Sequence, residues 1–172
     1  MAIESLFQPF TIKSLTLKNR FVLAPMSRYT CPNETPTEEL VAYHRRRAER
    51  GLGLTITGAT AIDRPSANNH PELACFRPPT HAAWQRVVDA VHAAGGPIAL
   101  QLWHAGALYQ VEPDWLPAPV ESPSGIKPNG EPAGVAMTEE DIADTIDVYA
   151  RSTAQAQAMA RWLIACKPAC LT

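Results

Sequence analysis

The sequence predicts an α/β fold built on a parallel sheet, because apolar strand segments and amphipathic helix segments alternate along the chain. The strand segments are continuously apolar, which is typical of strands buried on both faces. A polar residue stands at the carboxyl end of each strand: Ser27, Thr57 and Gln101. No GxGxxG motif follows the first strand, which disfavours an open, doubly wound nucleotide-binding sheet. A sheet of the TIM (β/α)₈-barrel type, whose chemistry lies at that rim, is therefore favoured.

The first strand and helix are marked by a proline and by capping residues. Residues 19–25 (NRFVLAP) form a short apolar run that a proline ends, so they predict a strand. Thr35 is expected to cap the following helix, with Glu38 completing a capping box. The helix is expected to extend to about Arg50 and to end at Gly51.

The second strand and helix follow the same pattern. Residues 52–58 (LGLTITG) predict a strand, and Thr80 is expected to cap a helix that ends at Gly95. Four apolar residues share one face of that helix at helical spacing and are expected in the core: Trp84, Val87, Val88 and Val91.

The third unit contains a long proline-rich excursion. Residues 97–102 predict the third strand, and Thr138 is expected to cap the third helix, beyond the excursion. The predicted buried stripe of this helix consists of Ile142, Ile146 and Tyr149. Residues 162–166 are apolar and predict a short fourth strand.

The composition describes a globular chain and excludes several partners. Of its 172 residues, 46% are hydrophobic and 19% are charged, enough for one domain with its own core. A net charge of −2 provides no electrostatic footprint for nucleic acid or an anionic membrane. No apolar run reaches the roughly 20 residues that span a bilayer, and the start lacks a signal-peptide layout. We therefore expect a cytoplasmic protein without a membrane partner.

Few residues are arranged in the sequence as metal ligands usually are. The cysteines form no CxxC pair and match no common zinc spacing, so four free thiols are expected: Cys31, Cys75, Cys166 and Cys170. A metal-dependent barrel hydrolase would need clustered His and Asp at the strand ends, where only His104 stands. We therefore expect no metal site. His44 and His92 lie within predicted helices and are expected to be packing or surface residues.

The three strand ends together indicate a flat ligand. They offer small residues that expose backbone (Gly58 and Ala59), a hydroxyl, an amide and two aromatic side chains. No carboxylate pair and no Ser-His-Asp set is present among them. An amide that both donates and accepts, beside closely approachable backbone, suits a heterocycle with mixed donors and acceptors, such as a flavin pyrimidine ring.

Four stretches in order, LFQPFTIKSLTLKNRFVLAPMSRY, HRRRAERGLGLTITGAT, WQRVVDAVHAAGG and QLWHAG, resemble the Old Yellow Enzyme family of FMN-dependent ene-reductases (NADH:flavin oxidoreductases). The resemblance covers residues 6 to about 155. It implies the first three to four βα units of a TIM barrel, a partial barrel, with FMN as cofactor and NADH or NADPH as reductant. The implied reaction passes a hydride from flavin N5 to the β-carbon of a small activated alkene, such as an enone.

The resemblance also implies roles for individual residues around the flavin. Pro25, Met26 and Ser27 match the family segment that lies against the isoalloxazine, and Ser27 takes the position whose side chain tunes the ring near N5 and O4. Ala59 matches the residue whose backbone contacts the pyrimidine. Gln101 matches the amide that hydrogen-bonds the same ring.

The implied substrate pocket is bordered by Tyr29 and Trp103. Two positions depart from the family pattern: Gly58 stands where many relatives have Glu, and Ala107 where many have Arg. His104, between these segments, is expected to be structural rather than catalytic.

The resemblance divides the chain at about residue 158. Residues 1–158 are expected to form the N-terminal half of an FMN-binding barrel, and residues 159–172 a divergent tail produced by truncation or a frameshift. Family members continue into a fourth strand with a His-x-x-His or His-x-x-Asn pair, and a Tyr proton donor lies further on. The tail contains no His, Asn or Tyr. We therefore assign no catalytic residue within this chain.

An incomplete barrel has physical consequences for function. Three or four strands cannot close a barrel that needs eight, and the phosphate site of such barrels follows strands seven and eight. We therefore expect impaired FMN binding and impaired ene-reductase activity. The alternative interpretation is a non-catalytic half-barrel, whose open edges act through self-association into a homo-oligomer or through a C-terminal partner.

Overall fold

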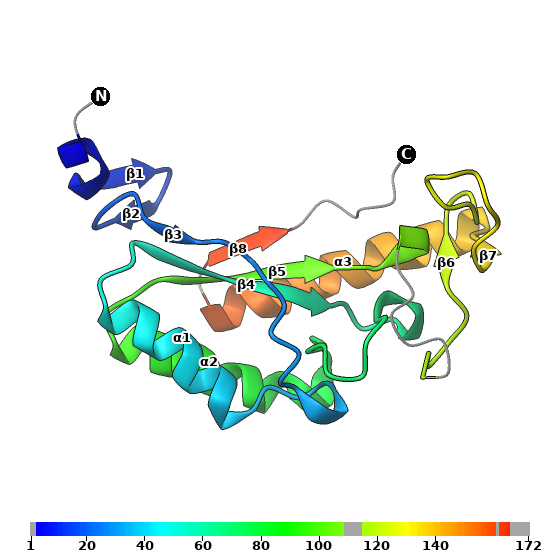
Figure 1. The fold of residues 1–172 in the computed structure, drawn as a ribbon, viewed down its shortest axis with the longest axis horizontal. Coiled ribbons are helices and arrows are strands. Elements are labelled where there is room, and N and C mark those ends of the chain that lie inside the picture. Colours follow the sequence, from blue (N-terminus) through cyan, green and yellow to red (C-terminus); the bar gives the residue numbers. More distant parts are fainter. Residues whose placement is uncertain (1–2, 109–114, 161, 166–172) are drawn as a thin grey trace.

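The computed structural model describes residues 3–108, 115–160 and 162–165. Its centre is a four-stranded sheet in the order β3-β4-β5-β8, with every neighbouring pair parallel (Figure 1). These strands are β3 (Val22–Leu23), β4 (Leu54–Ala61), β5 (Ile98–Trp103) and β8 (Trp162–Ala165). The predicted α/β class with a parallel sheet is confirmed, and the described strands do not close into a barrel.

The helices between the strands pack into one core. They are α1 (Glu38–Glu49), α2 (His81–Ala93) and α3 (Glu139–Ala160). All three contribute to the hydrophobic cluster that also holds Ile98, Leu100 and Leu102, which share one face of β5 by strand alternation. The helices described here therefore cover the same face of the sheet.

An N-terminal hairpin lies at the amino ends of the strands (Figure 1). It consists of the 3₁₀ helix η1 (Ile3–Phe7) and the antiparallel strands β1 (Phe10–Ile12) and β2 (Leu15–Leu17). Leu17 packs with Leu54 and Ala99 in a second, smaller cluster. The hairpin thus covers part of the sheet face that the helices leave uncovered.

Short turns and strands occupy the connections at the carboxyl ends of the sheet. The 3₁₀ turns are η2 (Pro32–Glu34), η3 (Pro65–Ala67), η4 (Pro78–Thr80) and η5 (Gly106–Leu108). The excursion after β5 contains a parallel pair, β6 (Glu121–Ser122) and β7 (Val135–Ala136). This pair lies beyond the carboxyl ends of the strands, near the start of α3 (Figure 1).

The predicted cap of α1 is wrong, and that of α2 is confirmed in position but not in its side-chain hydrogen bond. Thr37 caps α1 by accepting from Leu40 N, whereas the Thr35 hydroxyl donates to Asn33 O within the preceding turn. Thr80 is the N-cap residue of α2, as predicted, but its side chain makes no capping hydrogen bond, because its hydroxyl donates to Cys75 O at 2.6 Å. In both cases a turn just before the helix uses the expected hydroxyl.

The third cap and the fourth strand agree with the sequence. Thr138 Oγ1 accepts from Asp141 N at 3.2 Å, while Asp141 Oδ2 accepts from Thr138 N at 2.9 Å, a reciprocal capping box. β8 forms where residues 162–166 predicted a strand, and it pairs with β5. It lies inside the segment that the sequence predicts to diverge from the family.

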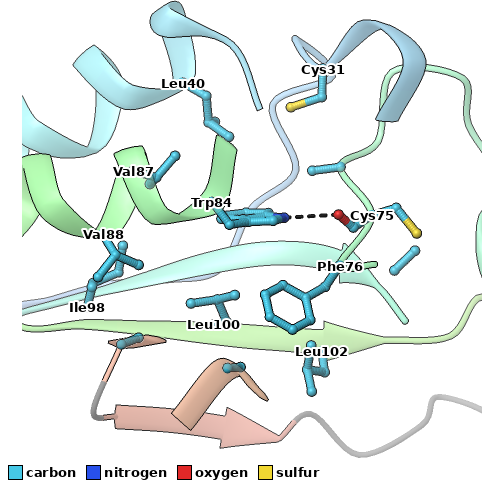
Figure 2. Close-up of a cluster of buried hydrophobic side chains, with 14 of the residues drawn as sticks. Cys31, Leu40, Cys75, Phe76, Trp84, Val87, Val88, Ile98, Leu100 and Leu102 are labelled. Atoms are coloured by element: carbon cyan, nitrogen blue, oxygen red, sulfur yellow. Dashed lines mark hydrogen bonds between the residues drawn. The ribbon is translucent and has the colours of Figure 1, made fainter. Parts of the chain in front are cut away.

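The predicted face of α2 is confirmed. Trp84, Val87, Val88 and Val91 are all at most 1% exposed. Trp84 also donates from Nε1 to Cys75 O at 3.0 Å, which joins α2 to the loop after β4 (Figure 2). Cys31 and Cys75 are free, as predicted, and both are buried; the two remaining cysteines lie outside the described residues.

The predicted stripe of α3 is wrong. Ile146 is 62% exposed, and Ile142 and Tyr149 are only half-buried. The buried positions recur every four residues instead: Val148, Ser152, Ala156 and Ala160. Small side chains allow the helix backbone to approach the sheet closely, so the smaller residues, and not the larger isoleucines, make the contact.

Across the described ranges, no helix is both long enough and apolar enough to cross a membrane. Within those same ranges, no cluster of three or more His, Cys, Asp or Glu side chains is arranged to hold a metal ion.

Two isoleucines give a matched test of this packing. Ile98 is fully buried in β5 and Ile146 is mostly exposed on α3. We expect Ile98→Val to lower the free energy of unfolding by about 0.5–1.5 kcal/mol, and Ile146→Val by less than about 0.5 kcal/mol. Urea unfolding followed by circular dichroism measures both. An equal loss in the two variants would contradict the assignment of the core.

Candidate functional site

Three strand ends meet closely at the carboxyl edge of the sheet. A Cβ placed on Gly58 would lie 2.3 Å from Pro25 Cβ and 2.8 Å from Gln101 Oε1. Both distances are far below ordinary contact, so only glycine fits between these two residues. Pro25 and Gln101, from two other strand regions, therefore both lie against Gly58, as the positions of the three residues at successive strand ends predicted.

A β-bulge lies at the same point of β4. Thr57 pairs with Leu100, but the next pair is Thr60 with Leu102, so β4 holds one extra residue there. Gly58 and Ala59 lie within this irregular stretch. Bulges redirect backbone groups and often lie beside functional sites. The sequence signal for it is the glycine inside a strand.

Ser27 fixes the bulge to the end of β3. Its Oγ accepts a hydrogen bond from Ala59 N at 2.9 Å. The Ala59 N–H is therefore already satisfied within the protein. Any contact of Ala59 with a ligand would therefore use atoms other than its N–H group. The backbone contact that the resemblance implied is limited to those atoms.

Met26 and Tyr29 lie further out on the segment after β3. Met26 is 54% exposed. Tyr29 has a left-handed backbone (φ 47°), and its ring centroid lies 4.1 Å from that of His70. His70 belongs to the loop after β4 and was not singled out by the sequence. Tyr29 therefore stands at the rim, held by an aromatic partner.

Trp103 lies at the boundary of the core. It is half-buried and packs against the main hydrophobic cluster, and its carbonyl accepts from Ile62 N at 3.1 Å. Of the predicted residues, Pro25, Ser27, Ala59 and Gln101 form one group around Gly58, whereas Met26 and Tyr29 are exposed at its edge. Trp103 packs against the core on one side and remains partly exposed.

A buried network surrounds His104, directly after β5. His104 Nδ1 accepts from Gly106 N at 3.0 Å, so Nε2 carries the proton of the neutral ring and faces Glu121 Oε1 at 3.5 Å. Burial lowers the pKa of His104 although the Glu121 carboxylate opposes that shift. His104 is therefore held neutral between backbone and carboxylate.

Arg64 is the centre of the same network. Its guanidinium donates to Glu121 in β6, with Nη2 3.0 Å from Oε2, and it also pairs with Asp141 and Asp144 in the first turns of α3. Ser66 donates to Glu121 as well. Although burial acts to raise it, the pKa of Glu121 is held below its usual range by the hydrogen bonds from Arg64 and Ser66. This network joins the loop after β4, the excursion and α3.

Two cavities lie near the strand ends. One, of about 20 Å³, is lined by Tyr29, His44, Gly58 and Ala59 among others, and has room for about one water molecule. The other, of about 760 Å³, lies among the connecting loops and is lined by residues that include His70 and Trp115. Gly58 and Tyr29 line the smaller cavity, and His70, the ring partner of Tyr29, lines the larger one.

His44, predicted to be a packing or surface residue, is buried beneath this site. It is 4% exposed, and burial, with smaller contributions from Arg47 and Arg28, lowers its pKa to about 4. His92 is exposed on α2. The neutral form of His44 is therefore part of the folded core.

The chain belongs to the NADH:flavin oxidoreductase / NADH oxidase family, whose model matches residues 5–162. It is 31% identical to morphinone reductase, whose solved structure superposes with a TM-score of 0.78 over 94% of this chain and 47% of that one. Old Yellow Enzyme from Pichia sp. AKU4542 is 26% identical, with a TM-score of 0.81 over 94% of this chain and 45% of that one. A metal reductase of Desulforamulus reducens is 35% identical over 153 residues, 88% of this chain and 22% of that protein.

These similarities confirm the resemblance to the Old Yellow Enzyme family. The chain spans less than half the length of each of these three proteins. The similarity to the two solved structures extends over 94% of this chain.

The buried His44 predicts a pH dependence of stability. Its pKa is lowered on folding, so between pH 6.5 and about 4 the unfolded chain binds a proton that the folded chain does not. Stability therefore falls with falling pH, by about 2 kcal/mol from this group between about pH 7 and about pH 5. We expect His44→Gln to remove most of this loss in urea unfolding. His92→Gln is the matched control, and a His44→Gln variant with the full loss would refute the assignment.

The Arg64 network predicts that a largely buried ion pair contributes more to stability than an exposed one. The side chains of Arg64 and Glu121 are 13% and 15% exposed, whereas Arg86 and Glu38 form an ion pair in which both are more than half exposed. We expect Arg64→Gln to lower the free energy of unfolding by about 2–4 kcal/mol, because it leaves a largely buried carboxylate short of its partner. Arg86→Gln should cost at most about 1 kcal/mol. Comparable losses in the two variants would argue against the network.

Proposed function

We propose that this chain supplies the ring-binding rim of an FMN-dependent oxidoreductase that uses NADH or NADPH to reduce activated alkenes. The observation that carries the proposal is the contact of Pro25 and Gln101 with Gly58 at the carboxyl edge of the sheet. Family membership supports it independently, since the matched family consists of NADH:flavin oxidoreductases.

The residues at this edge fit a flavin ring by their chemistry. The Gln101 amide offers both a donor and an acceptor, as the pyrimidine part of an isoalloxazine requires. Gly58 carries no side chain, so Pro25 and the Gln101 amide can both lie against the backbone of β4 at the carboxyl edge of the sheet. Met26, beside them, presents an exposed and polarisable side chain. Bound FMN would supply the hydride chemistry: a hydride would pass from the nicotinamide to the flavin, and from the flavin to the alkene β-carbon.

The chain's own residues would act by positioning. Gln101 would orient the pyrimidine edge, and Pro25 with Met26 would cover one face of the ring. Ser27 holds Ala59 through its hydrogen bond and so keeps the bulge in place. Tyr29, braced by His70, and Trp103 would border the substrate. A small enone is the substrate class that this arrangement supports.

We further propose that the chain alone binds FMN weakly and has little ene-reductase activity. In (β/α)₈ barrels the phosphate site follows strands seven and eight. The described sheet has four strands, and the chain spans under half of the solved relatives. The affinity that the described residues provide by themselves would therefore depend on their contacts with the ring. We also propose that residues 159–172 form a divergent tail, separate from the barrel half of residues 1–158.

A second candidate is a non-catalytic half-barrel that acts through association. It is favoured by one observation, the large apolar side chains that the N-terminal hairpin leaves exposed, such as Ile3 at 74% and Phe7 at 60%. A stable, colourless oligomer that ignores FMN would support this candidate over the flavin enzyme.

The ring contacts can be tested by titrating the purified protein with FMN and recording the flavin absorbance band. We expect a shifted band for the wild type and a dissociation constant about 10-fold higher for Gln101→Leu, since one amide pairing is lost. Gln85→Leu is the matched control, because the Gln85 amide lies on α2 and donates to Asp89 within the same helix. An unshifted band in the wild type, or equal affinity in the two variants, would contradict the proposal.

A further inference from the structure

The larger of the two cavities lies among three connecting segments of this chain. Its volume is about 760 Å³, within the range of roughly 300–1,000 Å³ that small-molecule pockets occupy. Its described walls come from the turn η2, the loop between β4 and α2, and the excursion after β5. These lining residues fall between residues 32 and 117, well inside the matched residues 5–162. The cavity is therefore built by this chain's own loops.

Two ion pairs hold these walls together. Arg77, in the loop after β4, pairs with Glu34 of η2, whose carboxylate also accepts from Asn68 Nδ2 at 2.8 Å. Arg64, which directly precedes a lining proline, pairs with Glu121 of the excursion. The side chains of Glu34, Arg64 and Glu121 are at most 15% exposed. Separating largely buried charges is costly, so the three walls are held in one arrangement.

The cavity is lined by flat and rigid groups. Two are aromatic, the half-buried indole of Trp115 and the imidazole of His70, and the others are four prolines: Pro32, Pro65, Pro71 and Pro117. The ring centroid of His70 lies 4.1 Å from that of Tyr29, which holds the imidazole in place. Such rings lose little conformational freedom when a ligand packs on them. Their surfaces suit a planar and largely apolar ligand.

Two lining residues also offer hydrogen-bond donors. His70 Nδ1 accepts from Glu72 N at 3.1 Å, so the neutral imidazole carries its proton on Nε2. Arg77 Nε is buried and has no hydrogen-bond partner within the described part of the chain. The charges of the lining disfavour an anion, because it holds the carboxylates of Glu34 and Glu72 but one guanidinium, that of Arg77. A carbonyl group accepts hydrogen bonds without carrying a negative charge.

We propose that this cavity binds a neutral, planar aromatic molecule that carries a carbonyl group. The ring system packs against Trp115 and the lining prolines, and the carbonyl oxygen accepts from His70 Nε2 or Arg77 Nε. Gln101 is not among the described lining residues, so this site is separate from the proposed ring contacts at the strand ends. The proposal goes beyond the flavin function and does not require it.

Coumarin, a neutral bicyclic lactone, is a probe of this chemistry. Titrated into the isotope-labelled full chain without flavin or reductant, it should shift the backbone amide resonances of His70 and Glu72. Trp115→Ala should raise its dissociation constant about 10-fold or more, since the ligand loses its aromatic wall. Phe7→Ala removes a ring that is 60% exposed on η1, outside the cavity, and is the matched control with unchanged affinity expected.

A second variant and a second probe test the polar part of the site. His70→Phe keeps an aromatic ring beside Tyr29 but removes the N–H donor, so the dissociation constant of coumarin should rise about 3- to 10-fold. Naphthalene-2-carboxylate has a similar bicyclic ring but carries a negative charge. It should bind the wild type about 10-fold more weakly than coumarin does, because the lining carries the same sign of charge.

Several results would overturn the proposal: no coumarin binding, equal effects of Trp115→Ala and Phe7→Ala, no effect of His70→Phe, or tighter binding of the carboxylate. Gln101→Leu separates this site from the strand ends and should leave coumarin affinity unchanged. If Gln101→Leu weakens coumarin as much as Trp115→Ala does, the probe binds at the strand ends and the cavity site is refuted. Coumarin binding as expected in a protein that binds no FMN would refute the flavin function alone.

Discussion

The contact of Gly58 with Pro25 and Gln101 is the constraint on which the candidate site depends. No side chain larger than a hydrogen fits at this position, because a Cβ would lie within 3 Å of both neighbours. Gly58 lies in the bulge of β4, next to Ala59. The hydrogen bond from Ala59 N to Ser27 Oγ ties this bulge to the segment after β3. The arrangement gathers groups from three strand regions that are far apart in the sequence.

The rest of the molecule holds this edge in place at two levels. Below it, the buried face of α2 and the Trp84–Cys75 hydrogen bond fix the loop after β4 to the core (Figure 2). Beyond it, Arg64 and Glu121 join that loop to the excursion and to the start of α3. The core determines where the strands end, and the charged network determines how the loops lie around those ends.

How far the sequence predicts this structure depends on the range of the interaction. The valine face of α2 and the Thr138 capping box are local patterns, and both are present as predicted. The α1 cap was displaced by a turn that local spacing does not reveal. Arg64 and Glu121 are 57 residues apart, so no sequence pattern relates them.

The same distinction applies to the site itself. Strand-end residues could be placed at one edge from the alternation of elements alone, because parallel strands end on the same side. The bulge and the satisfied Ala59 N–H could not be foreseen, since they depend on how β3 and β4 meet. Ile146 shows the reverse error: a large apolar residue was expected inside, yet small residues make the contact with the sheet.

The most direct test of the central claim uses lumiflavin, which carries the flavin ring without the phosphate. Titrated into isotope-labelled protein, it should shift the side-chain amide resonances of Gln101 and the backbone amides of Met26, Gly58 and Ala59, and leave the Gln85 amide unchanged. That result would establish the strand ends as a ring-binding surface in this chain. Shifts confined to other regions, or no shifts at saturating lumiflavin, would contradict it.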